Sequence, residues 1–556
     1  MKRFKLLSIA LLFMFLAGCN EQEWLKEVPL DFYSPENSYK TYNQFNSAVA
    51  RLYESTNNIV MWSDFNGNSM YHYCSDIAYN SIDPTNNMSS YTDKLKPESG
   101  DPLYFWQGYY RIVFDANVII GRIDNKETEI SDAKIKNQLK AEAMFFRAFM
   151  YRNLGIHFGG VPLILEEISE PRRNFVRAPI EDIWKQCISD LDFATINLPE
   201  VTELKEDGRL TKAAAYQLLT EIYIITKNYD AAITAASKII SNTNYSLMTK
   251  RFGKDKDKTG DVYWDLFRRE NQNRKSGNTE SIWVAQYEYN KEGGGGGSLL
   301  TRNLVPLYWY LKGSDGQNMF IGPSSKYGGR GIGFMSATDY LLKDVWKIDT
   351  TDIRNSKNNI IRDIRVDNPK SKYYGQLIVA SGAIKDYPDP WKRSWTAIFA
   401  KSAPLNDFPI ETIIDPVTGA TNTGANKTFR DHAYMRLAET FLLRAEAYLG
   451  KGDKTNAAND INTVRARANA KQITSSIVDI DFILDERARE LNFEELRIYT
   501  LMRLNKLAER VKKYDPMYNG VMANNGVEAY HNLWPIPQSE IERNTEAVLA
   551  QNPGYK

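Results

Sequence analysis

Residues 434–449 read YMRLAETFLLRAEAYL, and this stretch decides the fold class. Its apolar side chains recur at steps of three and four, which places them on one face of an α-helix. The members of that face are Tyr434, Leu437, Ala438, Phe441, Leu442, Ala445, Tyr448 and Leu449. Residues 140–158 show the same spacing. Residues 212–226 are apolar on nearly every side, which predicts a helix buried between two neighbours.

These helices also match a repeat pattern. In the tetratricopeptide repeat an aromatic residue is followed by Leu-Gly, then Tyr, and Ala nine residues later, because small residues let paired helices approach while aromatics fill the gaps. Two stretches match well and a third matches by half: Tyr216, Leu219, Tyr223 and Ala232; Phe441, Ala445, Tyr448 and Ala457; and Met144, Ala148 and Tyr151. Thr220 and Arg444 depart from the pattern. We therefore expect a mainly α fold with tetratricopeptide-like helical repeats over about residues 133–241 and 434–505.

The composition changes between these helical blocks. Residues 60–105 and 245–430 are rich in Gly, Asn, Asp, Pro and aromatic residues, and they include the pentaglycine run Gly293–Gly297 and a short β-like run at 280–289. Long loops inside a folded chain commonly carry function. We expect one domain over residues 40–556, with large irregular insertions, a few short strands and a variable ligand-binding part in the insertions.

The composition of the 556-residue chain excludes several classes of protein. Charged residues make up 25% and hydrophobic residues 43%, which excludes wholesale disorder and a protein that crosses a membrane many times. The chain carries 70 Lys and Arg against 69 Asp and Glu, so no overall charge favours nucleic acid. Three cysteines and four histidines leave little material for a disulfide scaffold or a zinc site.

The N-terminus carries an export signal. A basic start at residues 2–5 precedes an apolar run at 6–16, which is too short to span a hydrocarbon core of about 30 Å. The ending Leu-Ala-Gly-Cys resembles a bacterial lipobox, in which the chain is cut before the Cys and that Cys receives acyl chains. We expect a signal peptide at 1–18, lipidation of Cys19 and a lipidated tether at 19–39. An ordinary signal peptide with a chance Cys is the alternative.

Aromatic residues in the insertions are the main candidates for ligand contact. Sugar rings have apolar C–H faces that stack on flat side chains, and Tyr and Trp supply such a plane together with a polar tip. The candidates are Trp62, Tyr71, Tyr73, Tyr91, Tyr287, Tyr289, Tyr308, Trp309 and Trp391. If residues 280–289 form a strand, Tyr287 and Tyr289 share one face. For each residue taken alone, local packing is the alternative.

The sequence gives no clear pattern for catalysis, metal binding, phosphate binding or a disulfide. The acids Glu486, Glu490, Glu494 and Glu495 lie beside arginines at helical spacing, which predicts ion pairs in the scaffold and no catalytic pair.

Residues 255–261 begin like a calcium loop, but Leu266 replaces the closing Glu, so a solvated turn is expected and calcium is the alternative. The run GGRGIG at 328–333 lacks the Lys-Ser/Thr of a phosphate loop. Cys74 and Cys187 either pair or remain separate buried thiols. We expect no cofactor.

Several segments together resemble the SusD/RagB family of outer-membrane nutrient-binding lipoproteins of Bacteroidetes-type bacteria. The segments are Ala141–Leu163, Gly208–Ala215, Tyr434–Ala468, Glu486–Arg503 and the tail from Leu533 to Tyr555. With the lipobox they span the chain from end to end, and their order is more specific than any one of them. The residues that bind the ligand in this family lie in its variable loops. No sequence motif therefore identifies the corresponding residues of this chain.

The resemblance implies a function as well as a fold. A family member sits on the outer membrane, faces the cell surface, performs no catalysis and captures oligosaccharide for a SusC-like TonB-dependent transporter. We therefore expect a cell-surface lipoprotein that binds a glycan and delivers it to such a partner. A peptide-binding RagB-like uptake protein is one alternative. An anchored glycoside hydrolase and a repeat adaptor for protein tails are the others.

Overall fold

Helices dominate the part of the chain that the computed structural model describes, which comprises residues 38–61, 70–82, 90–385, 387–389, 391–516 and 525–555. The long helices are α3 (Tyr42–Thr56), α6 (Gly100–Arg122), α7 (Ala133–Phe158), α8 (Ile180–Asn197), α9 (Lys212–Ile225), α10 (Tyr229–Ile240), α14 (Leu437–Gly450), α15 (Lys454–Arg467) and α16 (Ile480–Leu491). The short helices are α4 (Met70–Tyr73), α5 (Tyr91–Lys94), α11 (Val262–Asp265), α12 (Leu300–Leu304), α13 (Asp339–Leu342), α17 (Arg497–Arg503), α18 (Leu507–Tyr514) and α19 (Gln538–Arg543). The prediction of a mainly α fold is confirmed.

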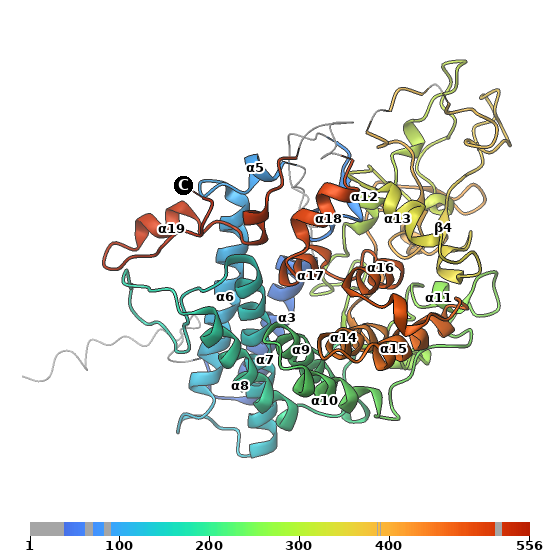
Figure 1. Cartoon of the computed structure of the whole chain (residues 1–556). Coiled ribbons are helices and arrows are strands. Elements are labelled where there is room, and N and C mark those ends of the chain that lie inside the picture. Colours follow the sequence, from blue (N-terminus) through green and yellow to red (C-terminus); the bar gives the residue numbers. More distant parts are fainter. Residues whose placement is uncertain are drawn as a thin grey trace, which may run out of the picture.

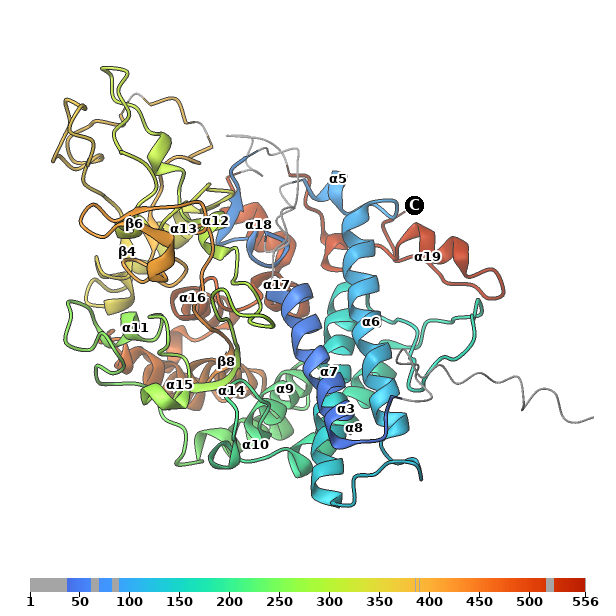
Figure 2. The same cartoon turned by 180° about the vertical axis from the view of Figure 1, so that it is seen from behind.

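The long helices form a stacked array. From α6 to α10 each helix packs against the next one along the chain, and α10 then packs against α14 and α14 against α15, although about 200 residues separate α10 from α14. Figure 1 shows this row, and Figure 2 shows the reverse side, where α3 covers α6 and α7. The long insertion therefore begins after α10 and ends before α14, and the two helices on either side of it pack directly against each other.

Small residues let neighbouring helices approach at two junctions. A Cβ atom on Gly155 of α7 would lie 2.4 Å from the ring of Trp184 on α8, and one on Gly450 at the end of α14 would lie 2.3 Å from the ring of Tyr229 on α10. Real Cβ atoms do not approach so closely, so an alanine at either place would push the two helices apart. The aromatic ring fills the space that the missing side chain leaves.

The described residues form four two-stranded antiparallel sheets, of which β4–β5 and β6–β7 lie within the insertion, whereas β1–β3 and β2–β8 join it to the rest of the fold. The strands are β1 (Ala78–Asn80), β2 (Ser281–Ala285), β3 (Met335–Ala337), β4 (Ile360–Ile361), β5 (Ile398–Phe399), β6 (Ile413–Asp415), β7 (Ala420–Thr421) and β8 (His432–Arg436). β2 pairs with β8, which leads directly into α14, and Trp283 of β2 stacks on Tyr434 of β8 with ring centroids 4.2 Å apart. A strand within residues 280–289 is therefore present, but it ends at Ala285.

The insertion has a hydrophobic cluster of its own. Tyr308, Phe320, Ile364, Ile378 and Ile398 pack together there, apart from the main core that the helices share. In Figures 1 and 2 this part of the chain, which follows α12, is mostly irregular and projects to one side of the helices. Loops that rest on a separate core present a defined surface.

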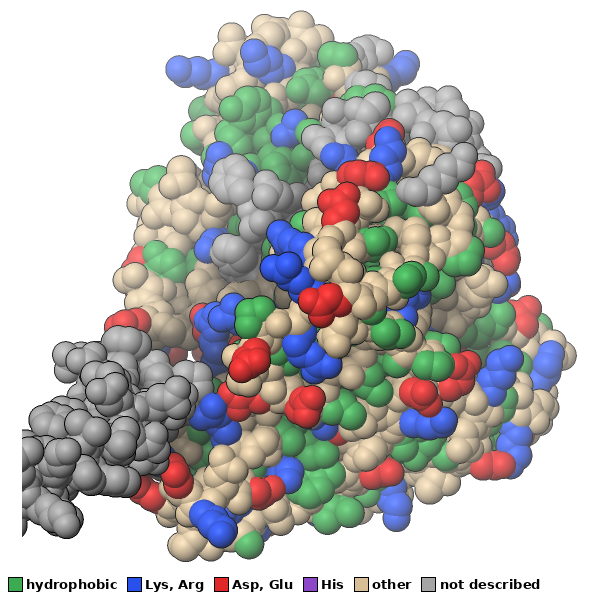
Figure 3. Space-filling model, turned by 90° about the vertical axis from the view of Figure 1, so that its left-hand side faces the viewer, with side chains coloured by type: hydrophobic (Ala, Val, Ile, Leu, Met, Phe, Trp, Pro, Cys, Tyr) green, Lys and Arg blue, Asp and Glu red, His purple; other side chains and the backbone are tan. Residues whose placement is uncertain are grey.

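The remaining global features concern the surface and the cysteines. Within the described ranges no helix combines the length and the apolar character that a membrane span requires. On the face seen in Figure 3, positive and negative side chains are interspersed among small hydrophobic patches. Cys74 and Cys187 are both buried and both free, so they form no disulfide.

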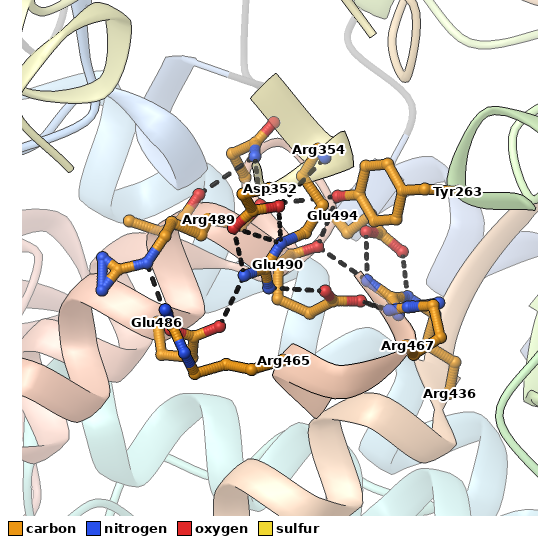
Figure 4. A network of polar contacts seen from close by, with 12 residues as sticks. Tyr263, Asp352, Arg354, Arg436, Arg465, Arg467, Glu486, Arg489, Glu490 and Glu494 are labelled. Atoms are coloured by element: carbon orange, nitrogen blue, oxygen red, sulfur yellow. Dashed lines mark hydrogen bonds and ion pairs between the residues drawn. The ribbon is translucent and has the colours of Figure 1, made fainter. Parts of the chain in front are cut away.

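A buried charge network joins the insertion to the helices (Figure 4). Its members are Glu280, Asp352, Arg354, Lys401, Arg436, Arg465, Arg467, Glu486, Arg489, Glu490 and Glu494. Arg354 from the insertion bonds Glu486 and Glu490 of α16 at 2.8 and 2.9 Å. The prediction that these acids form ion pairs in the scaffold is confirmed.

The same arginines control the ionisation of these acids. Burial alone raises the pKa of Glu486, but Arg354, Arg489 and Arg465 outweigh burial and hold that pKa at about 2. Arg436 and Lys401 act in the same way on Glu494, whose pKa also falls to about 2 against the effect of burial. These carboxylates are therefore ionised and engaged at neutral pH.

Candidate functional site

Four of the aromatic residues singled out in the sequence lie in the core. Tyr71, Tyr73, Tyr91 and Tyr308 are each at most 2% exposed. Their rings contact other buried rings: Tyr71 meets Phe105 and Trp534, Tyr73 meets Phe493, Tyr91 meets His531, and Tyr308 meets Phe320 and Tyr327. The expectation that they belong to a ligand surface is wrong in this structure, because almost none of their side-chain surface is exposed.

Local structure explains part of this burial. The segment that carries Tyr71 and Tyr73 forms the short helix α4, which packs on α17, so its rings enter the main core. Tyr308 begins the 3₁₀ turn Tyr308–Tyr310, and its hydroxyl donates to the carbonyl oxygen of Gly329 at 3.0 Å. Trp62 and the lipidation candidate Cys19 lie outside the described residues.

The next two residues of that turn face outward. Trp309 is half-buried, and Tyr310 is 55% exposed. Their ring centroids lie 4.3 Å apart with the planes inclined at 69°, so they offer two flat faces at an angle. The indole Nε1 of Trp309 donates to the carbonyl oxygen of Gly331 at 2.8 Å, which fixes the orientation of the ring. We call this pair the aromatic platform.

Two further segments meet the aromatic platform. The backbone N–H of Leu307 donates to the carbonyl oxygen of Arg393 at 3.0 Å, and Nε of Arg393 donates to that of Ile332 at 3.0 Å. The segments around residues 307–310, 330–334 and 391–393 therefore lie side by side. This arrangement brings the half-buried Trp391 to the same region as Trp309. Tyr387 also reaches it, since its hydroxyl donates to the carbonyl oxygen of Tyr310 at 3.5 Å.

Guanidinium groups flank the rings. The Cζ atom of Arg330 lies 5.8 Å from the ring centroid of Trp309. Arg302 and Arg393 both lie over the ring of Phe334, with their Cζ atoms 5.4 and 5.8 Å from its centroid. Arginine stacks on aromatic rings and keeps several N–H donors for other partners. The region therefore combines flat apolar faces with fixed donors.

A polar hollow forms a second feature of the insertion. It has a volume of about 960 Å³ and lies between the chain before the pentaglycine run and residues 429–431. Its lining includes Glu206, Arg269, Glu270, Gln286, Tyr287, Glu288, Tyr289, Lys291, Phe429 and Asp431. A smaller hollow of about 410 Å³ shares Glu206, Gln286 and Tyr287 and extends along α3, where Asn46, Asn57 and Asn58 line it. Amide side chains such as these suit hydroxyl groups.

The pentaglycine run builds one wall of this hollow. All of its members except Gly294 have a positive φ, which costs glycine little and most other residues more. A Cβ on Gly294 would lie 2.6 Å from the carbonyl oxygen of Glu288, and the backbone N–H of Glu288 donates to the carbonyl oxygen of Gly294 at 2.8 Å. Only glycine lets the loop fold back on Glu288 in this way.

Tyr287 and Tyr289 both line this hollow but differ in exposure. Tyr287 is 6% exposed, whereas Tyr289 is half-buried against Phe429, with ring centroids 4.8 Å apart. The expectation of a shared strand face fails because β2 ends before them. Tyr289 remains available for contact, whereas Tyr287 is almost fully buried.

The base of the hollow carries a perturbed carboxyl group. Asp431 accepts the backbone N–H of Tyr287 at 2.7 Å and Nδ2 of Asn273 at 2.7 Å. Burial raises the pKa of Asp431 to about 6, although these two hydrogen bonds act in the opposite direction. Its charge therefore changes in a mildly acidic medium.

The calcium-like loop is occupied by protein donors. Asp255 forms ion pairs with Lys258 and Arg268 at 2.7 and 3.1 Å, and Asp261 accepts the backbone N–H of Trp264, where α11 begins. Across the part of the chain that the structure describes, no three His, Cys, Asp or Glu side chains come together as a metal site would require.

Sequence reasoning left four contributors out of the candidate set. Tyr310, Tyr387, Arg330 and Arg393 all belong to the region of the aromatic platform. Tyr310 adjoins two chosen residues, so the run Tyr-Trp-Tyr was a usable signal for it. Arg330 and Arg393 carried no local signal, because only the folded chain brings their segments beside Trp309.

The fold defines a class, and comparison with known proteins then gives the family. The class is that of mainly helical proteins whose stacked helices carry large inserted loops. The model of the SusD family matches residues 246–555, and the model described as "Starch-binding associating with outer membrane" matches residues 30–224. The chain therefore belongs to the SusD family, as the resemblance in the sequence predicts.

Curated relatives and solved structures agree. A SusD-like protein of Formosa agariphila is 26% identical over 585 residues, covering 99% of each chain. The starch-binding protein SusD of Bacteroides thetaiotaomicron is 36% identical over 126 residues, which is 23% of this chain and 22% of that one. A laminarin-binding SusD-like protein has a TM-score of 0.64 at 21% identity and covers 93% of this chain and 100% of its own. Surface glycan-binding protein A of Bacteroides thetaiotaomicron in complex with laminarihexaose has a TM-score of 0.64 at 20% identity, covering 92% of this chain and 100% of its own.

Proposed function

We propose that this protein is a cell-surface lipoprotein that binds an oligosaccharide and delivers it to a SusC-like TonB-dependent transporter in the outer membrane. The observation that carries the glycan-binding proposal is the aromatic platform, Trp309 and Tyr310, whose outward faces adjoin guanidinium donors. A sugar needs both of these features, because its ring presents an apolar face and its rim presents hydroxyl groups.

The geometry suits a chain of sugar units rather than a small molecule enclosed in a cavity. The two rings of the aromatic platform are inclined at 69°, so successive sugar units of a curved chain can each meet one ring. Trp309 is already oriented by its hydrogen bond to Gly331, so binding costs little side-chain entropy there. The two polar hollows that Gln286 and Tyr287 line offer room for further sugar units.

The comparisons support a glycan over a peptide. One structural neighbour binds laminarin, another was solved with laminarihexaose, and a curated relative binds starch. A peptide-binding uptake protein is the second candidate, and a peptide panel tests it beside the sugars.

We further propose that Cys19 carries the lipid anchor and that residues 19–39 form the tether. Several acyl chains hold a protein on a membrane durably. A tether of this kind keeps the binding surface near the transporter, which raises its effective concentration there. The family description "associating with outer membrane" supports this placement. Cys19→Ala should move the protein from the membrane fraction to the soluble fraction, and full retention on the membrane would contradict the anchor.

The proposed role is binding without turnover. Glu486, Glu490 and Glu494 have side chains at most 6% exposed and are engaged by arginines, so they do not face a bound sugar. Incubation with an oligosaccharide should therefore release no shorter product. Turnover that disappears with one carboxylate would instead identify a glycoside hydrolase.

Titration of two variants against a matched control tests the binding proposal. Trp309→Ala and Tyr310→Ala each remove one flat face, which is worth about 1–3 kcal/mol and should weaken binding about fivefold to 150-fold. Tyr374→Ala removes an equally large ring that is 59% exposed on the same insertion but outside the aromatic platform, and it should bind as the wild type does. If no sugar in a broad panel binds, or if the three variants bind alike, the proposal fails.

A further inference from the structure

Positive charge gathers at the aromatic platform. Arg330 lies against Trp309, and Arg393 lies against Phe334 on a segment that is hydrogen-bonded to the chain just before Trp309. Arg302 lies over the same Phe334 ring. One guanidinium group therefore adjoins the aromatic platform, and two more, of which that of Arg302 is buried, lie at the neighbouring Phe334 ring.

Two of these groups differ from the arginines of the buried network. Among residues 38–61, 70–82, 90–385, 387–389, 391–516 and 525–555, no carboxylate oxygen lies within 4.0 Å of a nitrogen of Arg330 or Arg393. In the network of Figure 4, by contrast, Arg354 and Arg436 each contact two or more carboxylates. The fold thus compensates the deeply buried guanidinium groups, whereas Arg330 and Arg393 are half-buried and, among the described residues, have no carboxylate partner.

The nearby acid Asp389 is already engaged. Its carboxylate accepts the backbone N–H groups of Arg393, Ser394 and Trp395 at 2.9, 2.6 and 3.3 Å. Hydrogen bonds of this kind stabilise the ionised carboxylate and order the segment after Asp389. The charge of Asp389 still acts on Arg393 at longer range, but among the described residues it forms no ion pair with that guanidinium group, which therefore keeps N–H donors for a ligand.

Two of the guanidinium groups, those of Arg302 and Arg330, also repel each other. Burial lowers the pKa of Arg302, and the positive charge of Arg330 lowers it further. Burial likewise lowers the pKa of Arg393, with Asp389 acting in the opposite direction. An anion placed among these groups would relieve both the repulsion and the loss of hydration.

We propose that the glycan recognised at the aromatic platform is acidic, with a uronate carboxylate or a sulfate ester that receives hydrogen bonds from Arg330 and Arg393. This inference rests on the proposed function and adds the substrate class to it. The adjoining rings of Trp309 and Tyr310 specify a sugar that bears the anion rather than a free anion. Guanidinium matches a carboxylate or a sulfate through two parallel N–H donors, as a neutral hydroxyl does not.

Matched pairs of probes test the charge of the sugar. Hexagalacturonate is compared with its fully methyl-esterified form, and a κ-carrageenan hexasaccharide with its desulfated form. Within each pair the sugar units are the same and only the anionic groups are removed, carboxylates in the first pair and sulfates in the second. Isothermal titration should show at least one anionic probe binding about tenfold to a hundredfold more tightly than its neutral partner, as expected for charge-assisted hydrogen bonds. Raising the salt from about 50 mM to about 300 mM should narrow this difference.

Variants assign that preference to the two arginines. Arg330→Gln and Arg393→Gln should each lose most of the preference for the anionic probe, and the neutral probe should weaken much less than the anionic one, because Gln still donates hydrogen bonds to hydroxyl groups. Arg330→Lys keeps the charge and should retain part of the preference. Arg111→Gln removes the same charge from an exposed position on α6, with a side chain that is 72% exposed, and should change nothing. Thermal melting confirms that each variant is folded.

The possible results distinguish failure of the acidic-glycan proposal from failure of the glycan-binding proposal on which it rests. If neutral and anionic probes bind alike and the Trp309→Ala variant weakens both, the protein binds glycans but the acidic class is wrong. If Arg330→Gln and Arg393→Gln behave as Arg111→Gln does, the assignment to these arginines is wrong. If no probe and no other glycan binds, both proposals fall.

Discussion

Neutralising Glu490 at the centre of the buried network should destabilise the whole fold. Its carboxylate contacts Arg354 at 2.9 Å, Arg436 at 2.5 Å and also Arg467, and its side chain is fully buried. Glu490→Gln keeps the shape but leaves those guanidinium groups with less compensating charge. Removing one partner of a buried ion pair costs about 3–5 kcal/mol. This loss of stability affects the insertion and the helices together, because Arg354 belongs to the insertion and Glu490 to α16.

The melting temperature makes this cost measurable. Unfolding entropy is about 2 cal/mol/K per residue, or on the order of 1 kcal/mol/K for a chain of 556 residues, so Tm should fall by about 3–5 °C at pH 7. Glu509→Gln is the matched control. Glu509 pairs with Lys506 at 2.8 Å, but its side chain is 56% exposed, and exposed pairs contribute only about 0–1 kcal/mol.

The pH dependence distinguishes lost charge from lost packing. Arginines hold the pKa of Glu490 well below its ordinary value despite burial, so its contribution is fully present above about pH 4.5 and declines as pH falls further. The difference in Tm between wild type and Glu490→Gln should thus stay constant from pH 7 to pH 5 and narrow below pH 4.5. A Tm within 1 °C of wild type at pH 7, or a difference that persists unchanged toward pH 3, would refute the reasoning.

Two further predictions concern the scaffold and the hollow. Gly155→Ala should lower Tm, because the new Cβ would lie 2.4 Å from Trp184 and overpacking of this kind costs about 1–3 kcal/mol. A nearby exposed substitution, Lys185→Ala on α8, should leave Tm unchanged, and equal behaviour of the two variants would contradict the steric account. Asp431→Asn should raise Tm relative to wild type at pH 7.5 but not at pH 4.5. The reason is that a buried carboxyl group with a pKa of about 6 weakens the fold once it ionises. A difference that does not vary with pH would be the contrary result.

The helical part of the fold was predictable because its signals are local. The spacing in residues 434–449 predicts one apolar face, and α14 covers Leu437–Gly450 within that stretch. The nearly all-apolar stretch 212–226 predicts burial on two sides, and α9 does pack between α8 and α10. Short-range periodicity suffices where each helix meets its neighbours along the chain.

The orientation of the loop aromatics was not predictable from local pattern. Tyr308, Trp309 and Tyr310 are consecutive, yet the first is fully buried and the third is 55% exposed. What decides between them is contact with Phe320 and Gly329, which follow 12 and 21 residues later. Tyr71 and Tyr73 were misplaced for the same reason, since their partners Trp534 and Phe493 lie more than 400 residues away. In irregular segments, contacts with residues far away in the sequence determine which side chains are buried and which are exposed.

The charge at the aromatic platform depends on long-range contacts as well. Arg330 and Arg393 are separated by 62 residues from each other and meet near Trp309 only through the pairing of their segments. Charge counts along the sequence average to nearly zero and conceal such a local excess.

A crystal structure of the protein with its tightest-binding hexasaccharide tests the central claim most directly. A sugar ring stacked on Trp309 or Tyr310 at van der Waals distance, about 3.5–4.0 Å, is the predicted result. A sugar bound along the helices α9 and α14, with both rings of the aromatic platform uncovered, would contradict it.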